Sequence, residues 1–344
     1  MQNREIALQS QRQSFRDLLH HVWRHSSFYR ELYSGSGIRE GELDEIMPNH
    51  LPLIDKKLLM EHFDEAVTDP RLRKHDLGRW IHENRDPAAD FLDKFIVVHS
   101  SGSSGDIGIF VYSRAERQLA ASAMASHLPP PENYGAGKTK VAFYLASHSN
   151  LGGVSYAARM PRSIYDTLIL SVFDSEEHLA KKLNEYQPHQ LQGYTSSIYD
   201  LSQLAIAGKL RISPKRITVG GEKLTRSMEG AIRRVWDVPI YDFYQASESS
   251  FIAIRQPGSD EMNIITDLNI LEVLDEENLP ALDDQPGLPG PCRDRPVCRG
   301  KPGPKGAAAV PRDENSPAGR RRSLARPDPP SLASKTSIPG SLTR

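Results

Sequence analysis

Three short stretches of the sequence combine glycine, hydroxyl and carboxylate side chains in patterns that suit a phosphorylated ligand. The first is the serine and glycine run 100–105, which separates two apolar segments, 95–98 and 107–112. The apolar segments on both sides predict a tight loop between two strands, and a flexible linker would not fit there. Glycine lets backbone amides approach an anion and serine adds donors, so the loop suits a polyphosphate, although a plain loop stays open. It lacks the Gly-Lys-Ser/Thr ending of a P-loop.

The second stretch is Val-Gly-Gly-Glu-Lys-Leu-Thr, residues 219–225. A pair of glycines leaving a strand gives a ligand access to the backbone, because no side chain stands in the way. Glu222 adds a hydrogen-bond acceptor directly after Gly221. A simple turn is the alternative interpretation of this stretch taken alone.

The third stretch, residues 241–249, ends a short apolar strand with polar side chains. Asp242, Tyr244, Ser247 and Glu248 supply two carboxylates and two hydroxyls there. Magnesium prefers oxygen ligands and bridges phosphates, so a carboxylate beside a phosphate loop suits a magnesium–nucleotide complex. The third stretch therefore predicts the metal side of a nucleotide site.

The elements around these stretches alternate between strand and helix patterns. The expected strands are 95–98, 107–112, 140–147, 168–173, 190–194, 216–221 and 239–244. The expected helices are 15–33, one within 51–63 that Asp55 caps, 116–128, 175–187, 196–208 and 225–236. This alternation predicts an α/β sheet with helices on both faces, where ligands gather at the carboxyl ends of strands.

Composition places the chain among soluble globular proteins. Its 344 residues are 38% hydrophobic and 25% charged, which is ordinary for that class. The polar start does not resemble a signal peptide, and no apolar run reaches the roughly 18 residues of a membrane span. Cys292 and Cys298 have neither zinc spacing nor a nearby histidine. These features predict a cytoplasmic protein with no membrane partner.

The composition changes abruptly near the end of the chain. Residues 286–344 hold 12 Lys and Arg against 4 Asp and Glu, 12 of the 25 prolines, both cysteines and no aromatic residue. One interpretation is a frame-shift near Gly287. The coding region after it would then be read in the wrong frame, which would give residues rich in Pro, Arg and Gly. The other is a genuine basic disordered tail that binds nucleic acid or anionic surfaces. We favour the frame-shift, which divides the chain into 1–287 and a disordered tail, 288–344, with no specific nucleic-acid partner.

The ordered set of three stretches resembles the adenylate-forming superfamily, and most closely its phenylacetate–coenzyme A ligase branch. Residues 100–107 match the family's phosphate loop, Ser-Ser-Gly-Thr-Thr-Gly-Lys-Pro, and 220–222 match its adenine loop. Residues 244–248 match its Tyr-Gly-x-Ser/Thr-Glu motif. The resemblance covers about 1–287, and it implies the α/β large N-terminal domain of such an enzyme, incomplete and followed by a disordered tail.

The resemblance also implies roles for particular residues. Tyr244 would stack on the adenine that Gly221 and Glu222 border, and Glu248 would bind Mg²⁺ as the catalytic residue. The remaining implied nucleotide-binding residues are Ser101, Gly102, Ser103, Ser104 and Gly105 around the β- and γ-phosphates, together with Asp242 and Ser247.

The implied reaction is ATP-dependent ligation of a carboxylic acid to coenzyme A. The acid's carboxylate attacks the α-phosphate of ATP, and coenzyme A then displaces AMP from the acyl-adenylate. The small-molecule substrate is a carboxylic acid. Tyr144, Phe173 and Tyr194 suit an aryl acid, but core packing explains these side chains equally well.

The sequence departs from the family pattern at three places. Asp106 stands where the family usually has lysine, and Gln245 replaces the glycine after Tyr244; both bear on ATP affinity. After Gly287 nothing matches the family's ribose-binding aspartate or its small closing domain, and we expect this truncation to impair turnover. Two alternatives stay open: acyl transfer to a protein or other acceptor, and a non-catalytic nucleotide-binding relative.

Overall fold

The computed structural model describes residues 2–102, 107–133, 135–147, 150–272 and 274. These residues all belong to one compact unit, Met1–Lys301. Three of the predicted phosphate-loop residues, Ser103, Ser104 and Gly105, lie outside the described residues, and so does the predicted tail, 288–344.

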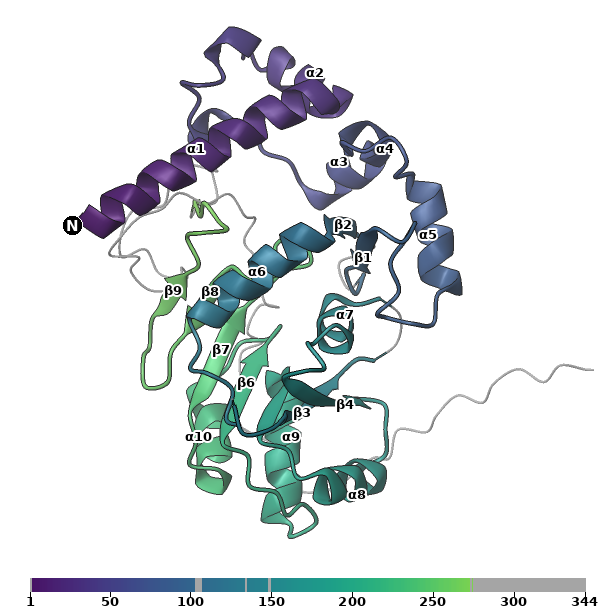
Figure 1. The fold of residues 1–344 in the computed structure, drawn as a ribbon, viewed down its shortest axis with the longest axis vertical. Helices are drawn as coiled ribbons and strands as arrows, with labels where there is room; N and C mark the ends of the chain where they lie inside the picture. Colours follow the sequence, from purple (N-terminus) through teal and green to yellow (C-terminus); the bar gives the residue numbers. More distant parts are fainter. Residues whose placement is uncertain (1, 103–106, 134, 148–149, 273, 275–344) are drawn as a thin grey trace, which may run out of the picture. The chain divides into compact units, whose positions relative to one another are not determined.

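The centre of the unit is a seven-stranded sheet in the order β4-β3-β5-β6-β7-β8-β9 (Figure 1). Strands β4, β3, β5, β6 and β7 run parallel, whereas β8 and β9 run antiparallel at one edge. The bounds are β3 Thr139–Leu145, β4 Tyr165–Ser171, β5 Gln190–Tyr194, β6 Arg216–Gly220, β7 Ile240–Tyr244, β8 Ala253–Arg255 and β9 Met262–Ile264. The predicted α/β class is confirmed.

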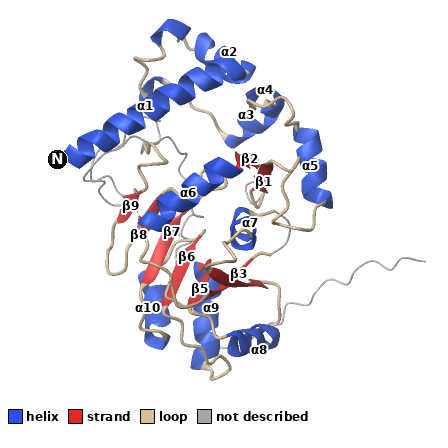
Figure 2. Ribbon diagram, in the orientation of Figure 1, coloured by secondary structure: helices blue, strands red, loops and turns tan. Residues whose placement is uncertain are grey.

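Helices cover both faces of this sheet (Figure 2). On one face, Leu183 and Ile198 of the helices pack with Ile217 of β6 in the largest buried cluster. On the other face, Met124 packs near Phe243 of β7. The helices are α8 Glu176–Tyr186, α9 Thr195–Ile206 and α10 Arg226–Val235 on the first face, and α6 Arg114–Ser126 and α7 Gly152–Ala158 on the second.

The N-terminal third is helical and differs in one respect from the sequence prediction. One helix was expected over 15–33, but the structure has two, α1 Gln2–His25 and α2 Ser27–Gly35. Ser26 separates them because its extended backbone and its side chain, which accepts from the Tyr29 amide, start a new helix. The other helical segments are η1 Glu40–Glu42, η2 Pro48–His50, α3 Lys56–Glu61, α4 Phe63–Ala66 and α5 Lys74–Glu83.

The segments around the first stretch form a hairpin apart from the main sheet. Strands β1, Phe95–His99, and β2, Ile109–Ser113, pair antiparallel with each other in a two-stranded sheet. The sequence predicted both strands but placed the first stretch at the carboxyl end of a strand of the α/β sheet. The hairpin must therefore be held against that sheet by other contacts.

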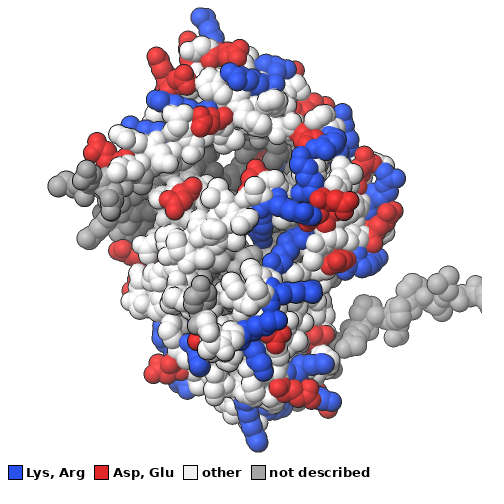
Figure 3. Space-filling view, viewed as in Figure 1, with Lys and Arg blue, Asp and Glu red and all other residues white. Residues whose placement is uncertain are grey.

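Charged side chains are mixed on the face drawn in Figure 3. Lys and Arg are interspersed with Asp and Glu, and the middle of this view is largely uncharged. Within the described part of the chain, no helix is both long and apolar enough to cross a lipid bilayer.

Candidate functional site

The loop between β1 and β2 is closed tightly at its base. The Ser100 amide donates to the Gly108 carbonyl at 2.9 Å, and the Gly108 amide donates to Ser100 Oγ at 2.8 Å. Gly102 has a φ of +73°, and a Cβ there would lie 3.0 Å from Ile107 Cγ1. Glycine is required at such a position because other residues rarely adopt it. These contacts place Ser101 and Gly102 at the start of a closed loop, as the sequence predicted.

Backbone contacts join this hairpin to the segment that follows β3. The His99 amide donates to the Asn150 carbonyl at 3.1 Å. His99 also forms a parallel bridge with Leu151, the residue before α7. The first stretch therefore starts beside the carboxyl end of the parallel sheet, although β1 is not one of its strands.

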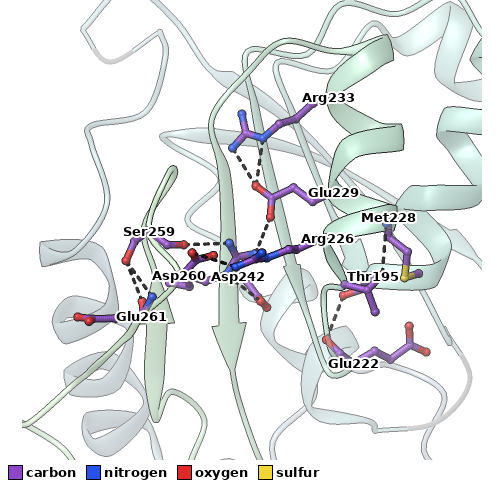
Figure 4. Close-up of polar contacts among 12 residues, drawn as sticks. Thr195, Glu222, Arg226, Met228, Glu229, Arg233, Asp242, Ser259, Asp260 and Glu261 are labelled. Atoms are coloured by element: carbon purple, nitrogen blue, oxygen red, sulfur yellow. Dashed lines mark hydrogen bonds and ion pairs between the residues drawn. The ribbon is translucent and has the colours of Figure 1, made fainter. Parts of the chain in front are cut away.

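The second stretch leaves β6 at the same end of the sheet. Gly221 has a φ of +76°, and a Cβ there would lie 3.1 Å from the Tyr194 ring. The Glu222 side chain accepts from the Ser196 amide at 2.8 Å, and its carbonyl accepts from Thr195 Oγ1 at 3.0 Å (Figure 4). A carboxylate at a helix N-terminus interacts favourably with the helix dipole. Glu222 thus stabilises the start of α9, a role that sequence reasoning missed.

The third stretch lies directly beside the second. Gly220 pairs with Phe243 across β6 and β7, and a Cβ on Gly220 would lie 3.7 Å from Gln245 Oε1. Tyr244 ends β7 with 51% of its surface exposed. An exposed aromatic ring at a strand end offers a face on which a planar ligand can stack. Glu248 is also exposed, on the loop that follows.

Side-chain contacts connect the hairpin to the third stretch. The Tyr112 hydroxyl of β2 donates to the Ser247 carbonyl at 2.5 Å, and Arg117 of α6 donates to Ser250 Oγ. Burial raises the pKa of Tyr112, a hydrogen bond with Ser250 and the Arg117 charge oppose this, and the nearby Glu248 charge adds to it. The structure thus brings the hairpin that carries the first stretch, and the second and third stretches, to one end of the sheet.

Asp242 alone among the described candidates lies in a different set of contacts. It is 6% exposed and pairs with Arg255 of β8, at 3.5 Å between Oδ2 and Nε. Arg255 also binds Glu229 of α10 at 3.0 Å, and Glu229 binds Arg233 at 3.0 Å (Figure 4). Burial raises the pKa of Asp242, although Arg255 opposes the rise. Asp242 therefore supports the edge of the sheet, and the structure does not bring it to the other candidates.

The described residues contain no preassembled metal site. No group of three or more His, Cys, Asp or Glu is close enough to hold an ion among them. Magnesium in nucleotide sites uses one or two carboxylates, with the remaining ligands from phosphates and water. Glu248, an exposed carboxylate near Tyr112 of the hairpin, fits that arrangement.

A cavity of about 330 Å³ lies between the sheet and helices α6 and α7. Gly220, Gly221 and Gln245 line it at the carboxyl ends of the strands, and Gln190 and Arg216 line it at the amino ends. Its polar lining comes from alternate residues of β5 and β6, so the polar residues at every second position of these strands are the sequence signal for this wall. The cavity lies next to the gathered stretches, so it is a candidate pocket for a second substrate.

The three aromatic residues considered for an aryl pocket occupy different places. Tyr194 lines the cavity. Tyr144 is 8% exposed in the core on the opposite face of the sheet, and Phe173 is 73% exposed. Of the three, only Tyr194 can contact a ligand in the cavity.

Comparisons with known proteins identify the fold. No protein-family model matches the chain. Protein CapK of Staphylococcus aureus is 21% identical over 271 residues, which are 74% of this chain and 54% of CapK. A crystal structure of an open conformation of 2-hydroxyisobutyryl-CoA ligase, in complex with 2-HIB-AMP and CoA, superposes with a TM-score of 0.61 at 17% identity. That match covers 78% of this chain and 56% of the ligase.

A second structure of that ligase, in the postadenylation state with 2-HIB-AMP, matches with a TM-score of 0.60 at 18% identity over 80% of this chain and 55% of the ligase. The fold is that of the N-terminal domain of adenylate-forming enzymes, so the predicted resemblance is confirmed at the level of fold. The chain spans about half the length of these relatives.

Proposed function

We propose that this chain provides the nucleotide-binding domain of an ATP-dependent carboxylic acid–coenzyme A ligase, of the phenylacetate–coenzyme A ligase kind. The observation that supports the proposal is that the hairpin carrying the first stretch meets the second and third stretches at one end of the sheet. Tyr112 connects the hairpin to Ser247, and Gly220 lies beside Gln245. Residues 1–287 would form this domain, with 288–344 as a separate tail.

The proposed first half-reaction joins the acid to AMP. The acid's carboxylate attacks the α-phosphate, and the bond to the β-phosphate breaks to release pyrophosphate. Amides and hydroxyls of the first stretch hold the β- and γ-phosphates, and Tyr244 stacks on the adenine beside Gly221. These groups act by positioning and by charge neutralisation. In the second half, the coenzyme A thiol attacks the acyl carbonyl and AMP leaves.

The acid would occupy the cavity between the sheet and α6 and α7. Gly220 and Gly221 line this cavity at the carboxyl ends of the strands, beside the proposed adenine position. Phe143, Tyr156 and Tyr194 contribute aromatic surface to the lining. This surface supports an aryl acid as the substrate, because aromatic rings pack favourably against one another.

The proposal is tested by acid-dependent pyrophosphate release from ATP, with coenzyme A or another thiol or amine as acceptor. Stimulation of AMP release by coenzyme A is the expected result. Stimulation by a different acceptor alone would favour acyl transfer elsewhere. ATP binding that does not compete with a stable acyl-adenylate analogue would contradict an adenylation site.

Replacement of the proposed magnesium ligand should separate metal binding from folding. Glu248→Gln removes a charge from an exposed side chain, so we expect an unchanged unfolding midpoint. Magnesium-dependent ATP binding should weaken about tenfold, the effect of losing one interaction with a charged partner. Calorimetric titration with ATP in the presence of magnesium or EDTA measures this. An equal loss under both conditions would assign Glu248 a structural role instead.

A further inference from the structure

The cavity wall formed by the central strands is unexpectedly polar. Gln190 and Gln192 of β5 and Arg216 and Thr218 of β6 face it from neighbouring positions. Strands of a parallel sheet that is covered on both faces are normally apolar on both sides. The other side of these strands follows that rule, since Leu191 is 1% exposed. The polar side chains on the cavity face therefore need partners other than core packing.

At the amino ends of the strands, the polar groups satisfy one another. Arg216 binds Glu132 at 2.7 Å and also donates to the Pro130 carbonyl at 2.8 Å. Gln190 donates to the second oxygen of Glu132. The Arg216 and Glu132 side chains are only 7% and 11% exposed. The charges at this end cancel, so a charged ligand group would lose its hydration there without gaining an unpaired opposite charge.

The middle of the wall has hydrogen-bonding groups that are not used within the described part of the chain. Gln192 uses one amide hydrogen to donate to Gln190 Oε1 at 3.3 Å. Its own Oε1 and the Thr218 hydroxyl have no hydrogen-bond partner within the described part of the chain. Water can satisfy these groups when no ligand is bound, but a ligand that fills the cavity displaces the water and must supply the partner.

The position of these groups sets where the ligand's polar atom would lie. Thr218 precedes Gly220 by two residues, which is about 7 Å along a strand. In the same cavity, Tyr156 of α7 contacts Phe143 and Phe251 edge to face, with ring centroids 6.2 and 5.6 Å apart, and Phe143 of β3 pairs with Gln192 of β5. The cavity thus presents aromatic rings next to neutral hydrogen-bonding groups.

We propose that the substrate acid carries a neutral hydroxyl or amide group at the end remote from its carboxylate, and that Gln192 and Thr218 bind this group. The inference rests on the proposed function, because it takes the cavity as the acid pocket. It narrows the substrate class from carboxylic acids in general to those with a neutral polar end. A purely hydrocarbon acid would leave both wall groups without partners.

The test compares two stable acyl-adenylate analogues, the sulfamoyl adenosines of 4-hydroxyphenylacetate and of phenylacetate. They share the adenosine half and differ by one hydroxyl. Calorimetry on the full chain should give about tenfold tighter binding for the hydroxylated compound, the effect of about one net hydrogen bond. Gln192→Leu and Thr218→Val should each reduce this ratio towards one. Thr167→Val is the matched control, because Thr167 lies on the same face of β4 as Tyr165 but does not line the cavity.

The outcomes separate the two proposals. Equal affinities for both analogues, or a ratio that survives both wall substitutions, would overturn the inference and leave the adenylation site intact. Failure of both analogues and of ATP to bind would overturn the proposed function, and the inference with it. A ratio that falls in Gln192→Leu and Thr218→Val but persists in Thr167→Val would establish the polar end of the pocket. Circular dichroism of each variant checks that it is folded.

Discussion

Replacement of Arg255 by methionine is expected to lower the free energy of unfolding by about 3–5 kcal/mol, the usual effect of removing one partner of a buried ion pair. Arg255 is 13% exposed and is shared between Asp242 and Glu229. Methionine keeps the apolar volume but leaves the Asp242 carboxylate buried without a cation. Glu229 keeps its ion pair with Arg233 in the variant. Most of the lost stability therefore comes from the unpaired Asp242 carboxylate. Urea denaturation at pH 7 measures the difference.

The pH dependence identifies the group responsible for this loss. Burial raises the pKa of Asp242, and Arg255 opposes the rise, so the pKa should rise further in the variant. A carboxyl with a raised folded-state pKa favours folding only while it is protonated, and that contribution disappears as the pH rises through the raised pKa. The deficit of Arg255→Met should therefore be smaller near pH 4 than at pH 7. Adding Asp242→Asn should restore part of the stability at pH 7, and a deficit independent of pH would contradict this account.

A substitution of Gly193 by alanine is expected to destabilise the sheet by about 3 kcal/mol, at the upper end of the usual cost of overpacking. A Cβ on Gly193 would lie 2.3 Å from the Tyr144 carbonyl oxygen. That oxygen belongs to the backbone of β3, which pairs with β5 at this position, so neither strand can move without breaking the sheet. Thermal and urea unfolding measure the effect.

Gly78→Ala is the matched control for this prediction. Gly78 lies within α5, and a Cβ there would meet nothing within 4 Å. Alanine favours a helix interior over glycine by about 0.5–1 kcal/mol, so this change should stabilise the protein. Equal effects of the two substitutions would mean that the close approach of β3 and β5 is not rigid.

The sequence predicted the parallel strands because their patterns are local, but it did not predict the short strands β8 and β9. Apolar runs bounded by glycine and proline gave β3, β5, β6 and β7 within a few residues, and Asp55 caps α3 through the Leu58 amide at 2.8 Å as expected. The break at Ser26 was missed because the apolar period continues through it. Only the geometry of the cap separates α1 from α2.

The candidate site could be predicted in part, for a similar reason. Motif order identified the stretches that meet, but the contacts that join them come from distant residues such as Tyr112 and Ser247. Asp242 and Arg255 illustrate the limit, since the strand pattern says only that alternate residues face opposite sides. The pairing of β7 with β8 brings Arg255 to Asp242, and no local sequence pattern predicts which strands pair.

Titration of the full chain with magnesium–ATP, compared with the double variant Ser103→Ala/Ser104→Ala, tests the central claim most directly. The claim is that the three stretches form one nucleotide site. If the first stretch holds the β- and γ-phosphates, the double variant loses about two hydrogen bonds to a charged group. ATP binding should then weaken by roughly 1–3 kcal/mol.

ADP and AMP provide the internal control. Loss of the two hydroxyls should weaken ATP binding more than AMP binding, because AMP lacks the phosphates that this loop is proposed to hold. An unfolding midpoint equal to that of the unaltered chain would show that the variant is folded. The account predicts measurable magnesium–ATP binding that falls in the double variant. ATP binding of unchanged strength in that variant, or no ATP binding by the unaltered chain, would contradict it.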